Sequence, residues 1–178
     1  MTRTLLLTLN EKRKRRPDGN TIYDLPNYFP NGIDSLTNLF KNPSEEEDPI
    51  TGSALLLVCD LQNNLGPYTF GSHASKLETP VRNLVTQEST SSLALQVAAI
   101  EAAGRLKLQT SLPQIQKNSR NQDADLSIRL NSLVVLSYYD EPQDIDYLKS
   151  LSEGDSNLRF AAKAALKERE RRLANQKG

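Results

Sequence analysis

The chain has 178 residues, 22 basic and 22 acidic side chains, 37% hydrophobic residues, one Cys and one His. This length supports one domain with its own core, and the zero net charge argues against a protein whose whole surface binds nucleic acid or an anionic membrane. A single Cys excludes an internal disulfide, and one Cys with one His excludes most transition-metal sites and most Cys/His or Ser/His catalytic centres.

Residues 1–50 differ in character from the rest of the chain. They contain five of the nine prolines, the basic run Lys12–Arg16 and the acidic run Glu45–Asp48, without a sustained helical period. We therefore expect an irregular, partly disordered N-terminal arm. The apolar run Leu5–Leu7 precedes its basic residues, which is the reverse of a secretory signal. Because the longest apolar run, Ala54–Cys59, is too short to span a bilayer, we expect a cytoplasmic protein with no membrane span.

Residues 51–178 are predicted to form one all-α domain. Short apolar-periodic segments alternate with polar turns, and no Val/Ile/Thr-rich alternation of strand length interrupts them. Pro80, Pro113 and Pro142 are placed near helix starts, where a missing N–H is tolerated, and Gly66–His73 is interpreted as a loop. The predicted helices are 52–65, 77–87, 92–106, 111–119, 124–139, 142–151 and 156–175.

A five-residue pattern recurs within the helical region. Asp125–Arg129 and Asp155–Arg159 share the pattern Asp-x-x-aliphatic-Arg thirty positions apart, and Ser92–Gln96 is a weaker copy 33 positions earlier. The first residue of each copy can cap a helix N-terminus, and the Arg lies one turn further along the same face. An alternative is that the arginines contact a partner's carboxylates. The expected structural caps are Ser92, Asp125 and Asp155, and the arginines expected to form a ladder with them are Arg129 and Arg159.

Equivalent positions after this pattern also carry similar residues in the three copies; we call each set of equivalent positions a column. Each patterned helix is preceded by a shorter segment with an apolar i, i+3 pair, and two helices per roughly 30 residues are typical of an αα-solenoid. The small column is Ala99, Ser132 and Ala162; the apolar column is Ala103, Leu136 and Leu166; the pairs are Val81/Leu84, Leu112/Ile115 and Ile145/Leu148.

Residues 75–172 resemble the HEAT-like repeat family, in particular the short bacterial phycobilisome-lyase HEAT-like repeats. Asn131 departs from the family's small residue after the Arg, and the helix at 52–65 is a candidate degenerate first unit. The resemblance implies a short right-handed αα-superhelix (a HEAT/armadillo-like solenoid) of about three helix pairs, whereas an ordinary helical bundle is the alternative. The residues that carry it are Asp155, Leu158, Arg159, Ala161, Ala162, Ala165 and Leu166, with Asp125, Ile128 and Arg129.

No Walker motif, GxGxxG, HExxH or nucleophile elbow is present. We therefore expect a non-enzymatic protein–protein interaction scaffold that uses the concave face of the solenoid, without a catalytic residue, metal or cofactor. Its partner would be another protein, including a heterodimer partner that completes the array. The candidate partner-binding residues are Gln96, Glu101, Ser127, Asn131, Tyr138, Arg159 and Lys163.

Two other functions are open at this point. The first is implied by the resemblance: a subunit of a bilin lyase or of a phycobilisome-handling factor. Its contacts for a tetrapyrrole would be Tyr138, Tyr139 and Arg129. Nucleic-acid binding through Lys12–Arg16 and the C-terminal basic residues ranks lowest, because residues 51–150 are slightly acidic.

The remaining reactive side chains have simple interpretations. Cys59 is predicted to be a buried core residue, and His73 a solvated loop residue. The mixed-charge run Lys167–Arg172 suits a polar, exposed helix end that caps a solenoid.

Overall fold

The computed structural model describes residues 51–52, 54–56, 59, 67–86, 92–154 and 157–175. All regular structure in these ranges is helical, so the all-α prediction is confirmed for them. The predicted N-terminal arm, with its basic and acidic runs, lies outside the described residues. The helices are α6 (Pro67–Thr86), α7 (Leu93–Arg105), the short 3-10 helix η1 (Gln109–Ser111), α8 (Leu112–Arg120), α9 (Leu126–Tyr139), α10 (Pro142–Glu153) and α11 (Arg159–Asn175).

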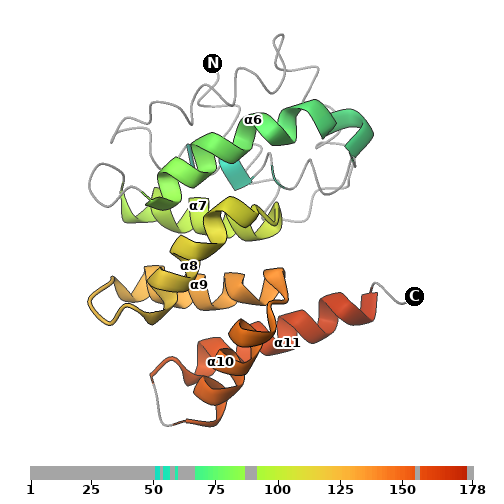
Figure 1. The fold of residues 1–178 in the computed structure, drawn as a ribbon. Helices are drawn as coiled ribbons and strands as arrows, with labels where there is room; N and C mark the ends of the chain where they lie inside the picture. Colours follow the sequence, from blue (N-terminus) through green and yellow to red (C-terminus); the bar gives the residue numbers. More distant parts are fainter. Residues whose placement is uncertain are drawn as a thin grey trace.

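The helices form two alternating sets. Helices α7, α9 and α11 form one row, in which α7 packs on α9 and α9 packs on α11. Helices α6, α8 and α10 each pack on the α-helix that follows them, and Figure 1 shows α6, α7, α8 and α9 succeeding one another down the molecule, with α10 and α11 together at the bottom. The helical residues near position 52 lie against α7, since a Cβ on Gly52 would be 3.2 Å from the Cβ of Ala98.

The core follows the columns predicted from the repeated pattern. The small column of Ala99, Ser132 and Ala162 is fully buried, as are Ala103 and Leu136 of the apolar column. Leu166, the third member of the apolar column, is only partly buried, because it lies in the last helix of the row. All six residues of the first-helix apolar pairs are also buried: Val81, Leu84, Leu112, Ile115, Ile145 and Leu148.

A close helix contact lies between the end of α7 and the middle of α9. A Cβ on Gly104 would lie 2.7 Å from Cγ1 of Val135, which is closer than two carbon atoms can approach. Glycine is therefore required at this position, although glycine inside a helix costs about 1 kcal/mol relative to alanine. The hydrogen atom of Gly104 allows the branched side chain of Val135 to fill the space where α7 meets α9.

Two sequence predictions about α6 are wrong. The segment Gly66–His73 was predicted as a loop, but the helix begins at Pro67, a residue well suited to the first helical position because it needs no N–H there. Pro80 was expected near a helix start and lies inside α6 instead. An internal proline costs about 3 kcal/mol, and burial of the flanking Leu77 and Val81, worth roughly 1.5–3 kcal/mol each, offsets that cost.

The boundaries of α7 to α11 agree with the predicted ranges to within a few residues, whereas the end of the predicted helix 52–65 lies outside the described residues. The largest remaining difference is at α11, which begins at Arg159 rather than at residue 156. Cys59 is fully buried, as predicted. Within the described ranges, no helix combines the length and the apolar character needed to cross a bilayer.

We expect Gly104→Ala to destabilise the protein, although alanine is the better helix former. The added methyl group collides with Val135, and overpacking of this kind costs about 1–3 kcal/mol. The free energy of unfolding, measured by urea denaturation followed by circular dichroism, should fall by that amount.

The reciprocal change supplies the control. Val135→Ala should be destabilising alone, but the double variant should lose less stability than the sum of the two single variants. Additive losses would contradict the close contact between these two residues.

Candidate functional site

Two of the residues predicted as caps occupy N-cap positions. The Oγ of Ser92 accepts a hydrogen bond from the Leu95 N–H at 3.3 Å at the start of α7. The Oδ1 of Asp125 accepts one from the Ser127 N–H at 2.7 Å at the start of α9. These side chains therefore satisfy helix N–H groups that have no intrahelical acceptor. The third predicted cap, Asp155, lies outside the described residues.

The predicted arginine ladder is not formed at Asp125. The Asp125 carboxylate binds a backbone N–H, and the Nε of Arg129 is buried without a hydrogen-bond partner. Arg159 is exposed at the first position of α11. Among the described residues, these arginines do not link successive units.

The links between successive second helices are made by other side chains. The hydroxyl of Tyr139, at the end of α9, donates its proton to the carbonyl oxygens of Ala103 at 3.0 Å and Leu108 at 3.1 Å, both near the end of α7. Burial raises the pKa of Tyr139 above its usual range. The Nε of Arg169 in α11 lies 2.7 Å from Oδ1 of Asp140, directly after α9. Tyr139 and Arg169 each follow the repeated Arg by ten positions, so they are equivalent in the pattern.

The first helices are linked by a buried carboxylate. Asp144 in α10 is fully buried and accepts hydrogen bonds from Nε2 of Gln116 and from Nη2 of Arg120 in α8, both at 2.8 Å. The Arg120 guanidinium also lies 4.6 Å from the ring centroid of Tyr147. The Tyr147 hydroxyl donates to the carbonyl oxygen of Ser119 at 3.3 Å. These contacts fix α8 against α10 and leave no reactive group free at this place.

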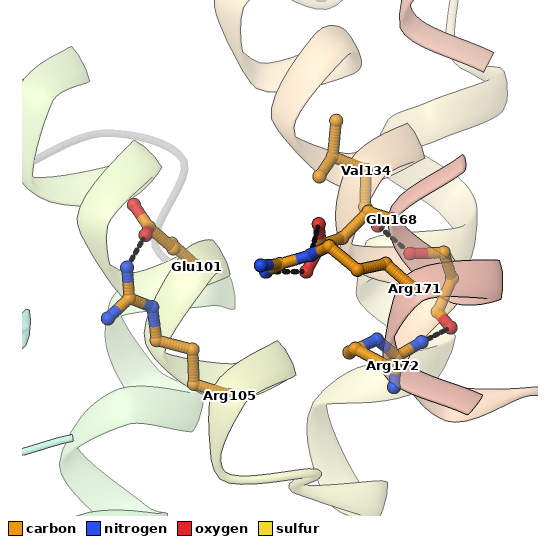
Figure 2. A network of polar contacts seen from close by, with 7 residues as sticks. Glu101, Arg105, Val134, Glu168, Arg171 and Arg172 are labelled. Atoms are coloured by element: carbon orange, nitrogen blue, oxygen red, sulfur yellow. Dashed lines mark hydrogen bonds and ion pairs between the residues drawn. The ribbon is translucent and has the colours of Figure 1, made fainter. Parts of the chain in front are cut away.

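A second polar cluster crosses all three helices of the row. We call it the open face and define it by Glu101 and Arg105 of α7, Tyr138 of α9, and Glu168, Arg171 and Arg172 of α11. Figure 2 shows Glu101 and Arg105 paired on one side and Glu168, Arg171 and Arg172 on the other. The Arg171 guanidinium makes a bidentate contact with the Glu168 carboxylate, with distances of 3.0 and 2.8 Å.

Tyr138 of α9 contacts Arg172 of α11 on the open face. The Arg172 guanidinium lies 4.5 Å from the Tyr138 ring centroid, a cation–π distance, and donates a hydrogen bond to the Ser137 carbonyl oxygen. Partial burial raises the pKa of Tyr138, and the charge of Glu168 raises it further, whereas Arg105 and Arg172 lower it. Charged groups from α7 and α11 thus act on one half-buried phenol from α9.

The structure divides the predicted partner-binding residues among three places. Glu101 and Tyr138 belong to the open face, and Asn131 and Ser127 lie seven and eleven positions before Tyr138 on the same stripe of α9. The Asn131 Nδ2 donates to the Ser127 carbonyl oxygen at 2.8 Å. The other three members of the set, Gln96, Arg159 and Lys163, lie elsewhere.

Gln96 borders a groove of about 370 Å³ near the starts of α7 and α9. Amide and carboxylate groups line most of this groove, and Val85, Leu93 and Ile128 form its apolar part. The two acidic groups at the groove are Asp123 and the capping Asp125. Arg159 and Lys163 are exposed on α11, away from the groove.

Two of the three residues named for a tetrapyrrole site, Tyr138 and Tyr139, have different surroundings. Tyr138 lies on the open face, whereas the Tyr139 hydroxyl is bonded to carbonyl groups at the end of α7. His73, interpreted as a loop residue, belongs to α6. Among the described residues, no group of three or more His, Cys, Asp and Glu side chains is placed to hold a metal ion.

Sequence reasoning did not identify most of the open face or the Asp144 cluster. The i, i+4 pair Glu101/Arg105 and the i, i+3 pair Glu168/Arg171 were visible as opposite charges at helical spacing. For Asp144 no such signal exists, because Arg120 is 24 positions away in the sequence.

No protein-family model matches the chain, and neither a curated protein nor a solved structure is significantly similar to it.

We expect the phenol of Tyr138 to titrate above its ordinary pKa of 10.0 and Glu168→Gln to lower that pKa. Tyrosinate absorbance measures the titration, and Tyr138→Phe assigns the signal. Because the folded state favours the neutral phenol, the free energy of unfolding should fall as pH rises above about 10, where the unfolded chain ionises first. Glu153→Gln, an exposed change on α10, should leave the Tyr138 titration unchanged.

Proposed function

We propose that this chain is a non-enzymatic protein-interaction scaffold, built as a short HEAT-like solenoid, whose open face binds another protein. The observation that carries the proposal is that charged side chains of α7 and α11 act on Tyr138 of α9, with the Arg172 guanidinium 4.5 Å from its ring centroid. A surface assembled from several repeats is what an αα-solenoid offers to a partner.

The alternation of the helices supports the solenoid. Each of α6, α8 and α10 packs on its successor, and α7, α9 and α11 pack on one another in order. Equivalent positions in the repeated pattern, Tyr139 and Arg169, both reach back to the end of the preceding second helix. A repeat array in which each unit contacts mainly its neighbours accounts for all three observations.

The chemistry of the open face supports a protein partner. Tyrosine and arginine are enriched in protein interfaces, where they combine a large contact area with hydrogen-bonding capacity. Val134 lies one turn before Tyr138 on α9 and is partly exposed beside the charged groups. The open face therefore combines an aromatic anchor, aliphatic surface and charges of both signs. The bilin alternative has no comparable support, because Tyr139 and Tyr138 face different surroundings.

The proposal predicts that a change on the open face abolishes partner capture without unfolding the protein. The variant is Tyr138→Ala combined with Glu168→Lys, which removes the aromatic ring and reverses one charge. Affinity capture from the native source, compared by mass spectrometry, identifies proteins bound by the wild type and lost by the variant. Purified candidates are then titrated against both forms.

The matched control is Lys149→Glu, a charge reversal at an exposed position of α10. It should capture the same proteins as the wild type. Circular dichroism must show that the open-face variant keeps its helical content. The proposal fails if the open-face variant and the control capture identical sets of proteins.

A further inference from the structure

The side of α11 that faces away from α9 carries a row of exposed cations. Arg159, Lys163, Lys167 and Arg171 follow one another at intervals of four residues, and all four are exposed. We call them the cation ridge. Four residues of helix rise by about 6 Å, so the ridge presents positive charge at regular intervals along the helix surface.

The cation ridge does not stabilise the folded protein. Arg171 pairs with Glu168, but Arg159, Lys163 and Lys167 form no ion pair among the described residues. Like charges at i, i+4 destabilise a helix by a few tenths of a kcal/mol per pair. The one exposed acidic residue of α11, Glu170, balances one of the four charges. The sequence thus keeps a self-repelling row of charges on its last described helix.

Two of the four ridge positions are buried in the preceding unit. In the register that aligns Arg129 with Arg159, Lys163 corresponds to Leu133 and Lys167 to Ser137. Leu133 and Ser137 are fully buried in α9, and the Ser137 carbonyl accepts a hydrogen bond from Arg172 of α11. The same flank that receives a helix on α9 is therefore exposed and cationic on α11.

An apolar group lies beside the charges. Phe160 is 81% exposed, and its position one residue after Arg159 places it next to the cation ridge. Ala164 and Ala174, also exposed, are small enough to allow another backbone to approach closely. An exposed Phe flanked by small residues and cations is a surface that can receive a helix with one apolar stripe and one acidic edge.

We propose that this flank of α11 binds an acidic amphipathic helix of a partner protein, which packs on α11 as α11 packs on α9. Carboxylates spaced four residues apart on that helix match the spacing of the cation ridge, and its apolar stripe covers Phe160. The positive ridge requires a partner with negative charge. The equivalent flank of α9 packs against a helix, which favours a protein helix over a nucleic acid as the occupant. This surface shares only Arg171 with the open face, and its test changes Lys163, Lys167 and Phe160 instead, so the two proposals can fail independently.

The test uses the full chain and a synthetic amphipathic peptide of about 20 residues, a length sufficient for an isolated helix. The peptide carries Glu at every fourth position beside a Leu stripe, and a matched peptide carries Gln in place of Glu. Fluorescence anisotropy should show saturable binding of the Glu peptide, weakening as salt is added, and about tenfold weaker binding of the Gln peptide.

Two variants locate the binding site. Lys163→Glu with Lys167→Glu, and separately Phe160→Ala, should each weaken peptide binding about tenfold, whereas Arg82→Glu, an exposed charge reversal on α6, should not. Lys163→Glu alone should raise the Tm of the free protein while weakening binding, because it relieves repulsion along the ridge. A residue with a purely structural role would not move the two measurements in opposite directions.

Other outcomes overturn the proposal. These are the absence of saturable binding of the Glu peptide, binding that the ridge and Phe160 variants leave unchanged, or tighter binding to a single-stranded oligonucleotide or anionic vesicle that depends on the same residues.

Discussion

The close contact between α7 and α9 is the constraint on which the rest of the structure depends. Gly104 leaves room for Val135, and small residues at Ala99, Ser132 and Ala162 keep the seam between neighbouring second helices narrow. Helix axes approach closely only where one side chain of each facing pair is small. Because α7, α9 and α11 lie near one another, charged groups of α7 and α11 can act on Tyr138 of α9. A wider spacing would separate those groups and leave three unrelated helix surfaces.

The two sets of helices are joined by different chemistry. In the row of second helices, Tyr139 and Arg169 reach backbone or carboxylate groups at the end of the preceding helix. Between the first helices, the buried Asp144 is held by Gln116 and Arg120. A buried carboxylate without such donors would be strongly unfavourable, so this cluster favours one orientation of α10 against α8. The charged side chains of the open face remain partly exposed, from 16% at Arg172 to 69% at Arg171.

The parts of the structure that depend on local pattern were predictable from the sequence. Capping by Ser92 and Asp125, and the burial of residues at helical spacing, follow from short-range chemistry. The helical start at Pro67 was missed, because neighbouring glycine and aromatic residues suggested a loop. The Asp144 cluster and the meeting of Glu168 with Tyr138 were not predictable, because they join residues from helices far apart in the chain. The exposure of one flank of α11 was likewise not predictable, because it depends on how the helices pack together.

The one-sided support of α11 has a consequence for how the array opens. Helix α9 is held by neighbours on both sides, whereas among the described elements α11 is held only by α9 and α10. In a repeat array, stability is approximately a sum of each unit's own stability and its nearest-neighbour interfaces. Protection of backbone amides from hydrogen exchange should therefore decrease from α9 towards α11, as local unfolding begins where a unit has fewest interfaces. A ligand bound to α11 would add an interface to this helix, so that α11 would unfold together with α9 instead of before it.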